Sequence, residues 1–184
     1  EIMENDSDFI TFLRPRRFGK SLLVSTLFYY YDLNSRDEFE TLFQDLYIAN
    51  HPTNERNSYY VLMLNFSELE FSNPFEIPEL FRSMLIERLR EFIQYYAPKE
   101  NHGEYFNILN PSTPINTMLR RTFHNIAGFE GKICVLIDEY DHFANRMIFS
   151  GLGKEYESAV RGTGFIRQFF TTLKALTSDK IKRI

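Results

Sequence analysis

The spacing of apolar side chains along the chain predicts an alternation of helices and strands. Apolar residues three or four positions apart share one face of a helix, and this spacing marks five segments. Uninterrupted apolar runs between polar residues are typical of strands buried on both faces, and three such runs occur. The predicted helices cover residues 20–31, 35–46, 85–96, 114–128 and 165–176, and the predicted strands cover residues 9–13, 59–66 and 133–137.

This order of elements favours an α/β fold in which a parallel sheet lies between two layers of helices.

Two segments lack a clear helical or strand pattern. Residues 98–114 are polar and begin and end with proline, so we expect an irregular insertion or flap. Residues 141–164 contain four glycines, so we expect a flexible excursion. With 43% apolar residues, the 184-residue chain can bury a sizeable core, and we expect residues 1–184 to form a single domain.

The most informative chemistry lies between the first apolar run and the first predicted helix, where the chain reads Gly19-Lys20-Ser21. At a strand-to-helix turn this tripeptide is the centre of a phosphate-binding (Walker A) loop. Backbone N–H groups surround the phosphates, the lysine reaches the terminal ones and the serine hydroxyl holds Mg²⁺. Lysine in the first turn opposes the helix dipole unless an anion lies there. The alternative is a solvated basic turn before a helix.

The loop departs from the usual G-x-x-x-x-G-K-[ST] pattern, because Arg14 stands where the first glycine belongs. Arginine does not readily adopt a positive φ, and Pro15 favours an extended conformation for the residue before it. The chain must therefore enter this loop in a different way. Arginines beside the phosphates fit polyphosphate recognition. The expected nucleotide-binding residues are Arg16, Arg17, Phe18, Gly19, Lys20, Ser21 and Leu22.

A second segment strengthens the prediction, because the apolar run 133–137 ends in Asp138-Glu139. Open α/β sheets bind ligands beyond the carboxyl ends of their strands. Asp138 is expected to hold Mg²⁺ together with Ser21, and Glu139 to activate the attacking water as a general base, which is the Walker B arrangement. Glu139 and Lys20 are therefore the predicted catalytic residues. An ordinary turn at the end of a strand is the alternative for the acidic pair alone.

The chain resembles the AAA-ATPase-like family in both segments. They read Phe12-Leu13-Arg14-Pro15-Arg16-Arg17-Phe18-Gly19-Lys20-Ser21-Leu22-Leu23 and Val135-Leu136-Ile137-Asp138-Glu139-Tyr140-Asp141. Members of that family typically carry the same loop, Arg14 included, and the same acidic segment. The resemblance covers nearly the whole chain. It implies a P-loop NTPase fold, a three-layer αβα arrangement with a mostly parallel sheet, and Mg²⁺-dependent binding and hydrolysis of ATP.

The resemblance also implies partners. In the family, the next core strand begins near Ile184, carries a polar sensor residue, and lies between the loop strand and the acid strand. We therefore expect that strand to be missing or only begun and the domain to be incomplete. Family members commonly continue into a PD-(D/E)XK nuclease-like domain. The resemblance thus implies that the ATPase regulates such a domain, with nucleic acid nearby, and AAA-type ATPases often assemble as homo-oligomeric rings.

Composition and charge narrow the kinds of protein that this chain can be. A net charge of −4 argues against the whole chain as an electrostatic match for nucleic acid. The single cysteine, Cys134, lies in an apolar run and is predicted to be a core residue. No apolar run reaches the length of a membrane span and no signal peptide is evident, so we expect a cytoplasmic protein with no membrane partner. The spacing of the four histidines matches no zinc site: His51, His102, His124 and His142.

Three other groups of residues are weaker candidates for functional roles. Asp141 and His142 follow the acidic pair, and a solvated loop is slightly favoured over a role near the metal. The tyrosines 29–31 could stack on bases, but their helical spacing favours core packing. Four arginines could reach the γ-phosphate of a neighbouring subunit, although such residues more often lie on the surface: Arg120, Arg121, Arg161 and Arg167.

Two other functions remain open. One is a module that binds nucleotide, or only scaffolds, without turnover; the altered loop at Arg14 motivates it, and the carboxylate of Glu139 argues against it. The other is a P-loop kinase acting on a small molecule. The pair Asp138-Glu139 fits the activation of water better than it fits transfer to such an acceptor.

Overall fold

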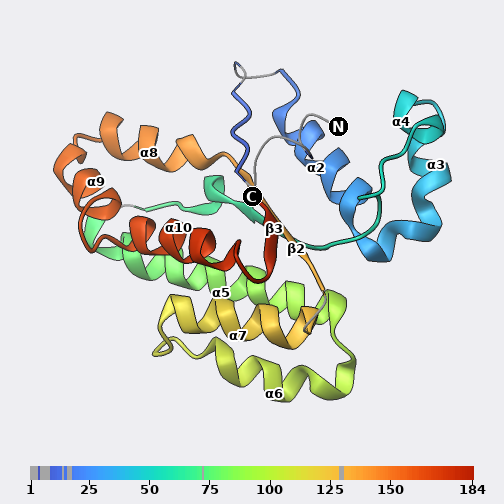
Figure 1. The fold of residues 1–184 in the computed structure, drawn as a ribbon. Coiled ribbons are helices and arrows are strands. Elements are labelled where there is room, and N and C mark those ends of the chain that lie inside the picture. Colours follow the sequence, from blue (N-terminus) through green and yellow to red (C-terminus); the bar gives the residue numbers. More distant parts are fainter. Residues whose placement is uncertain (1–3, 5–8, 14, 16–17, 72, 129–130) are drawn as a thin grey trace.

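The computed structural model describes residues 4, 9–13, 15, 18–71, 73–128 and 131–184. Its fold is α/β, with a small parallel sheet between helices (Figure 1). The strands are β1 (Tyr60–Asn65), β2 (Ile133–Asp138) and β3 (Ile181–Arg183), in the order β1-β2-β3. Both pairs of neighbours run parallel, as the alternation of helices and strands predicted.

Helices make up most of the remaining chain, and α5, α7 and α10 lie on one face of the sheet with α2 on the other (Figure 1). The α-helices are α2 (Lys20–Tyr31), α3 (Phe39–Phe43), α4 (Tyr47–Asn50), α5 (Ile77–Tyr96), α6 (His102–Phe106), α7 (Ile115–Ala127), α8 (Tyr140–Phe149), α9 (Gly153–Val160) and α10 (Phe165–Leu176). Short 3₁₀ helices are η1 (Leu33–Glu38), η2 (Phe66–Glu68), η3 (Pro74–Glu76), η4 (Lys99–Asn101) and η5 (Asn107–Leu109).

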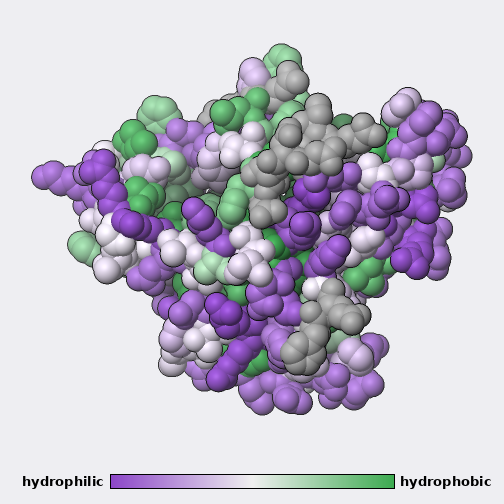
Figure 2. Space-filling view, viewed as in Figure 1, coloured by the Kyte–Doolittle hydropathy of each residue, from purple (hydrophilic) through white to green (hydrophobic). Residues whose placement is uncertain are grey.

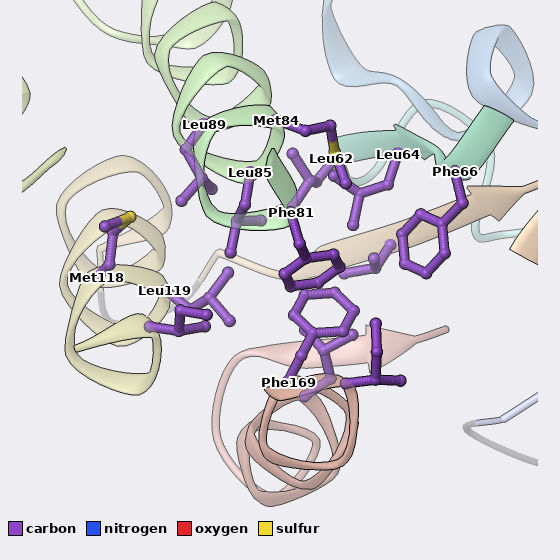
Figure 3. Close-up of a cluster of buried hydrophobic side chains, with 14 of the residues drawn as sticks. Leu62, Leu64, Phe66, Phe81, Met84, Leu85, Leu89, Met118, Leu119 and Phe169 are labelled. Atoms are coloured by element: carbon purple, nitrogen blue, oxygen red, sulfur yellow. The ribbon is translucent and has the colours of Figure 1, made fainter. Parts of the chain in front are cut away.

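The larger hydrophobic core lies between the sheet and α5, α7 and α10 (Figure 3). Successive strand residues point to opposite faces, so Leu62 and Leu64 of β1 enter this core while Val61, next to Leu62, does not. Phe81 of α5 meets Phe169 of α10 edge to face, with ring centroids 5.3 Å apart. Both rings are fully buried, and they join two helices that are distant in sequence.

A second, aromatic core lies on the α2 face of the sheet. Tyr30 and Tyr31 of α2 are buried there beside Val61 and Cys134 of the strands, and Phe39 and Phe43 of α3 complete the cluster. Tyr30 and Tyr31 are therefore core residues, as their helical spacing favoured, and they are not available to stack on bases. Tyr29 is 42% exposed, so the prediction of core packing was wrong for that residue. The burial of Cys134 confirms its assignment to the core.

Strand β3 lies on the side of β2 opposite β1, and the backbone N–H of Ile10 donates to the carbonyl of Ile184 at 2.9 Å. A strand thus begins between β2 and the segment that leads into the Gly19-Lys20-Ser21 loop, which is where the family resemblance placed the next core strand. Residues 9–13 themselves form no strand, so that prediction was wrong.

Two segments expected to be irregular are folded into short helices. Residues 98–114 contain η4, α6 and η5, because Tyr105, Phe106 and Leu109 pack against the main core. Residues 141–164 contain most of α8 and all of α9. Helix α8 buries Phe143 and Met147, and these contacts outweigh the glycines around it.

The predicted helix over residues 35–46 is also different in the structure. Ser35 lies inside η1, and its hydroxyl donates to Oδ2 of Asp32 at 2.6 Å, so it does not cap α3. Leu42 and Leu46 are about half exposed.

No helix in the part of the chain that the structure describes is long and apolar enough to cross a bilayer.

Candidate functional site

Helix α2 begins with backbone donors that have no partner within the helix. Gly19 is its N-cap, in the left-handed region at φ 73°, where glycine avoids the clash that a Cβ would cause. The carbonyl of Gly19 accepts from the N–H of Leu23 at 2.9 Å, which closes the first turn. The N-cap residue supplies no side-chain hydrogen bond, and the first turn holds no acidic residue. The end of α2 is therefore suited to an anion, and Lys20 adds a cation there.

Asp138 is the last residue of β2 and its side chain is only 5% exposed. Its Oδ1 accepts from the backbone N–H of Glu139 at 2.8 Å, which fixes the carboxylate at the carboxyl end of the strand. Its other oxygen, Oδ2, has no hydrogen bond from a described residue. A carboxylate held in this way keeps one oxygen for a metal ion or a water.

Glu139 turns the chain from β2 into α8 through a left-handed conformation, with φ 52° and ψ 32°. For a residue with a Cβ this conformation costs about 1–2 kcal/mol. Backbone strain of this kind clusters at functional sites, where the surrounding structure holds it in place. The strain therefore singles out Glu139 independently of the sequence motif.

One cavity of about 620 Å³ brings the two motifs together. The segment 19–22 forms one wall, and Asp138 and Glu139 form another. Six residues of the predicted site, from two segments that are far apart in sequence, thus meet in space: Gly19, Lys20, Ser21, Leu22, Asp138 and Glu139. Leu22 is 71% exposed. The complete lining is Gly19, Lys20, Ser21, Leu22, Asn65, Ser67, Asp138, Glu139 and His142.

The remaining predicted ligands do not line this cavity or fall outside the description. Phe18 is 67% exposed and is absent from the wall. Arg14, Arg16 and Arg17 lie outside the described residues. The four candidate arginines are all exposed and do not line the cavity, and Arg161 pairs with Glu157 of its own helix at 3.6 Å.

The sequence reading missed Asn65 and Ser67. Asn65 is the last residue of β1 and is the direct register partner of Asp138 on β2. Its Oδ1 accepts from the N–H of Ser67 at 3.0 Å, which leaves its amide N–H₂ group for the cavity side. The rule that ligands bind at the carboxyl ends of parallel strands, already applied to Asp138, also points to Asn65.

His142 also lines the cavity, from the first turn of α8. Its backbone N–H donates to the carbonyl of Glu139 at 2.9 Å. Its neighbour Asp141 accepts from the amide of Asn145 at 3.5 Å and does not border this cavity. The solvated loop favoured for these two residues is thus a helix, and His142 belongs to the wall of the site.

A second cavity of about 720 Å³ adjoins the first and shares Lys20, Asp138 and Glu139 with it. Its other walls are mostly apolar and come from residues 9–13, α2 and β2. Some hydrophobic surface is visible near the top of the molecule in Figure 2. In the segment 9–13, Leu13 is 73% exposed. An apolar surface therefore borders one side of the polar cavity.

The described residues contain no group of three or more His, Cys, Asp or Glu side chains that could hold a metal ion by themselves. The residues with side-chain oxygens in the cavity lining are two serines, Ser21 and Ser67, the amide Asn65, and the carboxylates Asp138 and Glu139. Mg²⁺ usually keeps several waters and takes one or two protein ligands together with substrate phosphates. The donors around Ser21 and Asp138 fit that mode of binding.

A comparison with protein-family models matches residues 1–184 to the family described as predicted AAA-ATPase. No curated protein and no solved structure matches the chain. The match covers the whole chain, including both walls of the cavity.

Proposed function

The chain belongs to the predicted AAA-ATPase family, and from that premise we propose that it binds ATP with Mg²⁺ and hydrolyses the terminal phosphate. The observation that carries this proposal is the shared cavity of the two motifs. A helix N-terminus with free donors and a lysine faces the same space as a fixed carboxylate and a strained glutamate. This is the combination that phosphoryl transfer to water needs.

The phosphates would lie at the N-terminus of α2. The backbone N–H groups at Lys20, Ser21 and Leu22 have no helical partners and can donate to phosphate oxygens. The Lys20 ammonium group neutralises charge on the terminal phosphates, where negative charge concentrates. Gly19 gives the backbone the left-handed turn with which the helix begins.

Ser21 and Asp138 would hold Mg²⁺ from opposite walls. The Ser21 hydroxyl is a direct ligand in the usual form of this site, and Asp138 binds the ion or its water shell. When bound, the ion supplies positive charge that stabilises the developing charge on the transferring group. The hydrogen bond from the Glu139 N–H keeps the Asp138 carboxylate in place for this task.

Glu139 would act as the general base. Its carboxylate takes a proton from the attacking water as the water oxygen forms a bond to the γ-phosphorus. The bond between that phosphorus and the β–γ bridging oxygen breaks, and the products are ADP and phosphate. The left-handed backbone at Glu139 places this side chain at the start of α8, beside Asp138 and not in line with β2.

We extend the proposal to the partners. The family resemblance supports control of an attached nuclease-like domain by the nucleotide state, with nucleic acid bound by that domain, and it is compatible with a homo-oligomer. The prediction is that nucleic-acid cleavage by the full-length protein depends on added ATP and that Lys20→Ala removes this dependence. Cleavage that is indifferent to nucleotide would reject this extension while leaving ATP hydrolysis intact.

The test of the proposed function is an equilibrium titration of Mg²⁺-ATP into the full-length protein, followed by measurement of phosphate release. Lys20→Ala should weaken binding by about tenfold or more, because it removes a charge-assisted contact. Glu139→Gln should retain binding and lower turnover by about 100-fold or more. Lys99→Ala, at an exposed residue of η4, is the matched control and should change neither.

The outcomes separate the rival functions. Binding without turnover in the unmodified protein would indicate a nucleotide-binding module. Absence of binding in a folded protein would indicate a scaffold. Transfer of labelled phosphate to a small molecule in place of water would indicate a kinase.

A further inference from the structure

His142 is the one cavity residue whose side chain has a polar atom shielded from solvent and without a hydrogen-bond partner among the described residues. The atom is ring nitrogen Nδ1. A shielded nitrogen without a partner is unfavourable, and such groups in native proteins commonly await a ligand, a water or a catalytic step. The same ring borders the cavity that holds Lys20 and Glu139.

The position of the ring is fixed by two neighbouring elements. His142 lies in the first turn of α8, one turn after Glu139, whose carbonyl accepts from the His142 N–H at 2.9 Å. Helix α8 is anchored to the segment after β1, since Arg146 donates to the carbonyl of Phe71 at 3.3 Å and Phe143 packs edge-on against Phe71. The start of α8, which carries His142, is therefore held in place beside the turn that carries Glu139.

The neighbours of His142 in the wall are groups that bind anions or metals. Asn65 and Ser67 offer an amide N–H₂ and a hydroxyl on the side of β1, and Lys20 lies on the side of α2. A neutral imidazole always carries one N–H group, so it is a donor whatever its charge. A donor at His142, one turn after Glu139, lines the same cavity as the proposed general base.

We propose that His142 donates a hydrogen bond to the terminal phosphate of bound ATP, and that this contact lets the site distinguish ATP from ADP. The inference rests on the proposed function, because it assigns a further residue to the same nucleotide. It goes beyond the two motifs, neither of which includes this residue. Loss of the terminal phosphate removes the contact, so His142 and the first turn of α8 report the nucleotide state.

The experiment compares two affinities in the full-length protein, one for Mg²⁺-ADP and one for a non-hydrolysable ATP analogue with Mg²⁺. His142→Ala should weaken binding of the analogue by about tenfold, as expected for a hydrogen bond to a charged group, and leave ADP binding within about twofold. A merely structural role would weaken both nucleotides together or neither. His51→Ala is the matched control, because His51 is exposed beside Tyr47 of α4 and lines neither cavity.

Two conservative variants test the donor itself. His142→Asn places an amide N–H near the position of Nδ1, and His142→Gln places one near the position of Nε2. One of the two should restore the preference for the analogue to within about threefold of the unmodified protein. If both fold normally and neither restores it, the ring only fills space and the inference is wrong.

A measurement without any substitution keeps the inference testable if the alanine variant fails to fold. The ring ¹⁵N signals of His142 should shift on addition of the analogue and shift little on addition of ADP, both with Mg²⁺. Equal responses to both nucleotides would overturn the inference. Failure of the unmodified protein to bind either nucleotide would overturn the proposed function as well, whereas tight binding with an unchanged ratio in His142→Ala would overturn the inference alone.

Discussion

The hydroxyl of Tyr96 donates a 2.7 Å hydrogen bond to Oδ1 of Asp32, whose carboxylate is completely buried. The same hydroxyl accepts from the backbone N–H of Val61 at 2.8 Å. Tyr95 and Ser35 donate to the other carboxylate oxygen, at 2.9 and 2.6 Å. Asp32 follows α2 directly, so this network ties the C-terminal end of α2 to α5 and β1. Burial, reinforced by the bond to Asp32, raises the pKa of Tyr96 and keeps the phenol protonated as a donor.

We predict that Tyr96→Phe destabilises the protein by about 1–3 kcal/mol, because the Val61 N–H and an Asp32 oxygen each lose a partner in a buried place. Urea denaturation followed by circular dichroism measures the free energy of unfolding. Tyr47→Phe is the control, since Tyr47 is 78% exposed and its loss of a hydroxyl should have little effect. Equal stabilities of the two variants would show that the network contributes nothing.

The strained backbone at Glu139 predicts a trade between stability and activity. Asparagine adopts the left-handed region more readily than glutamate does. Glu139→Asn should therefore be as stable as the unmodified protein or more stable by up to about 1 kcal/mol, while ATP hydrolysis is lost. Glu139→Gln loses the carboxylate without relieving the backbone, so it is the reference for stability. A Glu139→Asn variant that unfolds more easily than Glu139→Gln would contradict this account.

Sequence periodicity located the elements whose own pattern is strong. The predicted helices 20–31 and 165–176 match α2 and α10 residue for residue. The missed helices α6, α8 and α9 are short and are flanked by glycine or polar residues, so they depend on contacts with the rest of the core. The long helix α5 begins at Ile77, earlier than its apolar stripe, because Pro78 fits the first turn of a helix.

The residues of the candidate site also fall into two groups, those that a local sequence motif identifies and those that it does not. Gly19, Lys20, Ser21, Asp138 and Glu139 are recognisable because each motif is local in sequence. Asn65 and His142 carry no such signal, and they join the site only because β1 pairs with β2 in one register and α8 turns back over the strand end. Hydrophobic pattern gives the existence of a strand and not its register. The position of Asn65 near the end of its strand is a sequence signal, but its pairing with Asp138 and the return of His142 to the site become visible only in the structure.

The contact between Phe169 and Phe81 predicts that α10 is needed for a stable domain. Both rings are fully buried, and Phe169 also approaches Phe66 at 6.3 Å between centroids. Phe169→Ala should cost about 3–5 kcal/mol, which is a large share of the stability of a domain of this size. Phe149→Ala, at a ring that is 84% exposed, should cost far less. Thermal unfolding of both variants checks the prediction, and similar melting temperatures would place Phe169 outside the cooperative core.

Cys134 and Tyr95 predict a loss of stability at alkaline pH. Burial raises the pKa of the Cys134 thiol from 9.0 to about 12, and burial with the bond to Asp32 raises that of Tyr95 from 10.0 to about 12. Above pH 9 the unfolded chain releases protons that the folded chain retains, so the free energy of unfolding falls as pH rises, from about 9 to about 12. Below pH 9 both states keep these protons and the two groups contribute no slope. Unfolding at a series of pH values between 7 and 11 should show this decline. In Cys134→Ala the slope between pH 9 and 10 should be smaller, whatever the change in stability at neutral pH.

Because Cys134 is the only cysteine of the sequence, its reaction with a thiol reagent gives a second measurement. Modification should be slow at pH 8 and should accelerate only when the protein unfolds, whereas rapid modification of the folded protein would show that the thiol is accessible and that the pKa argument is wrong.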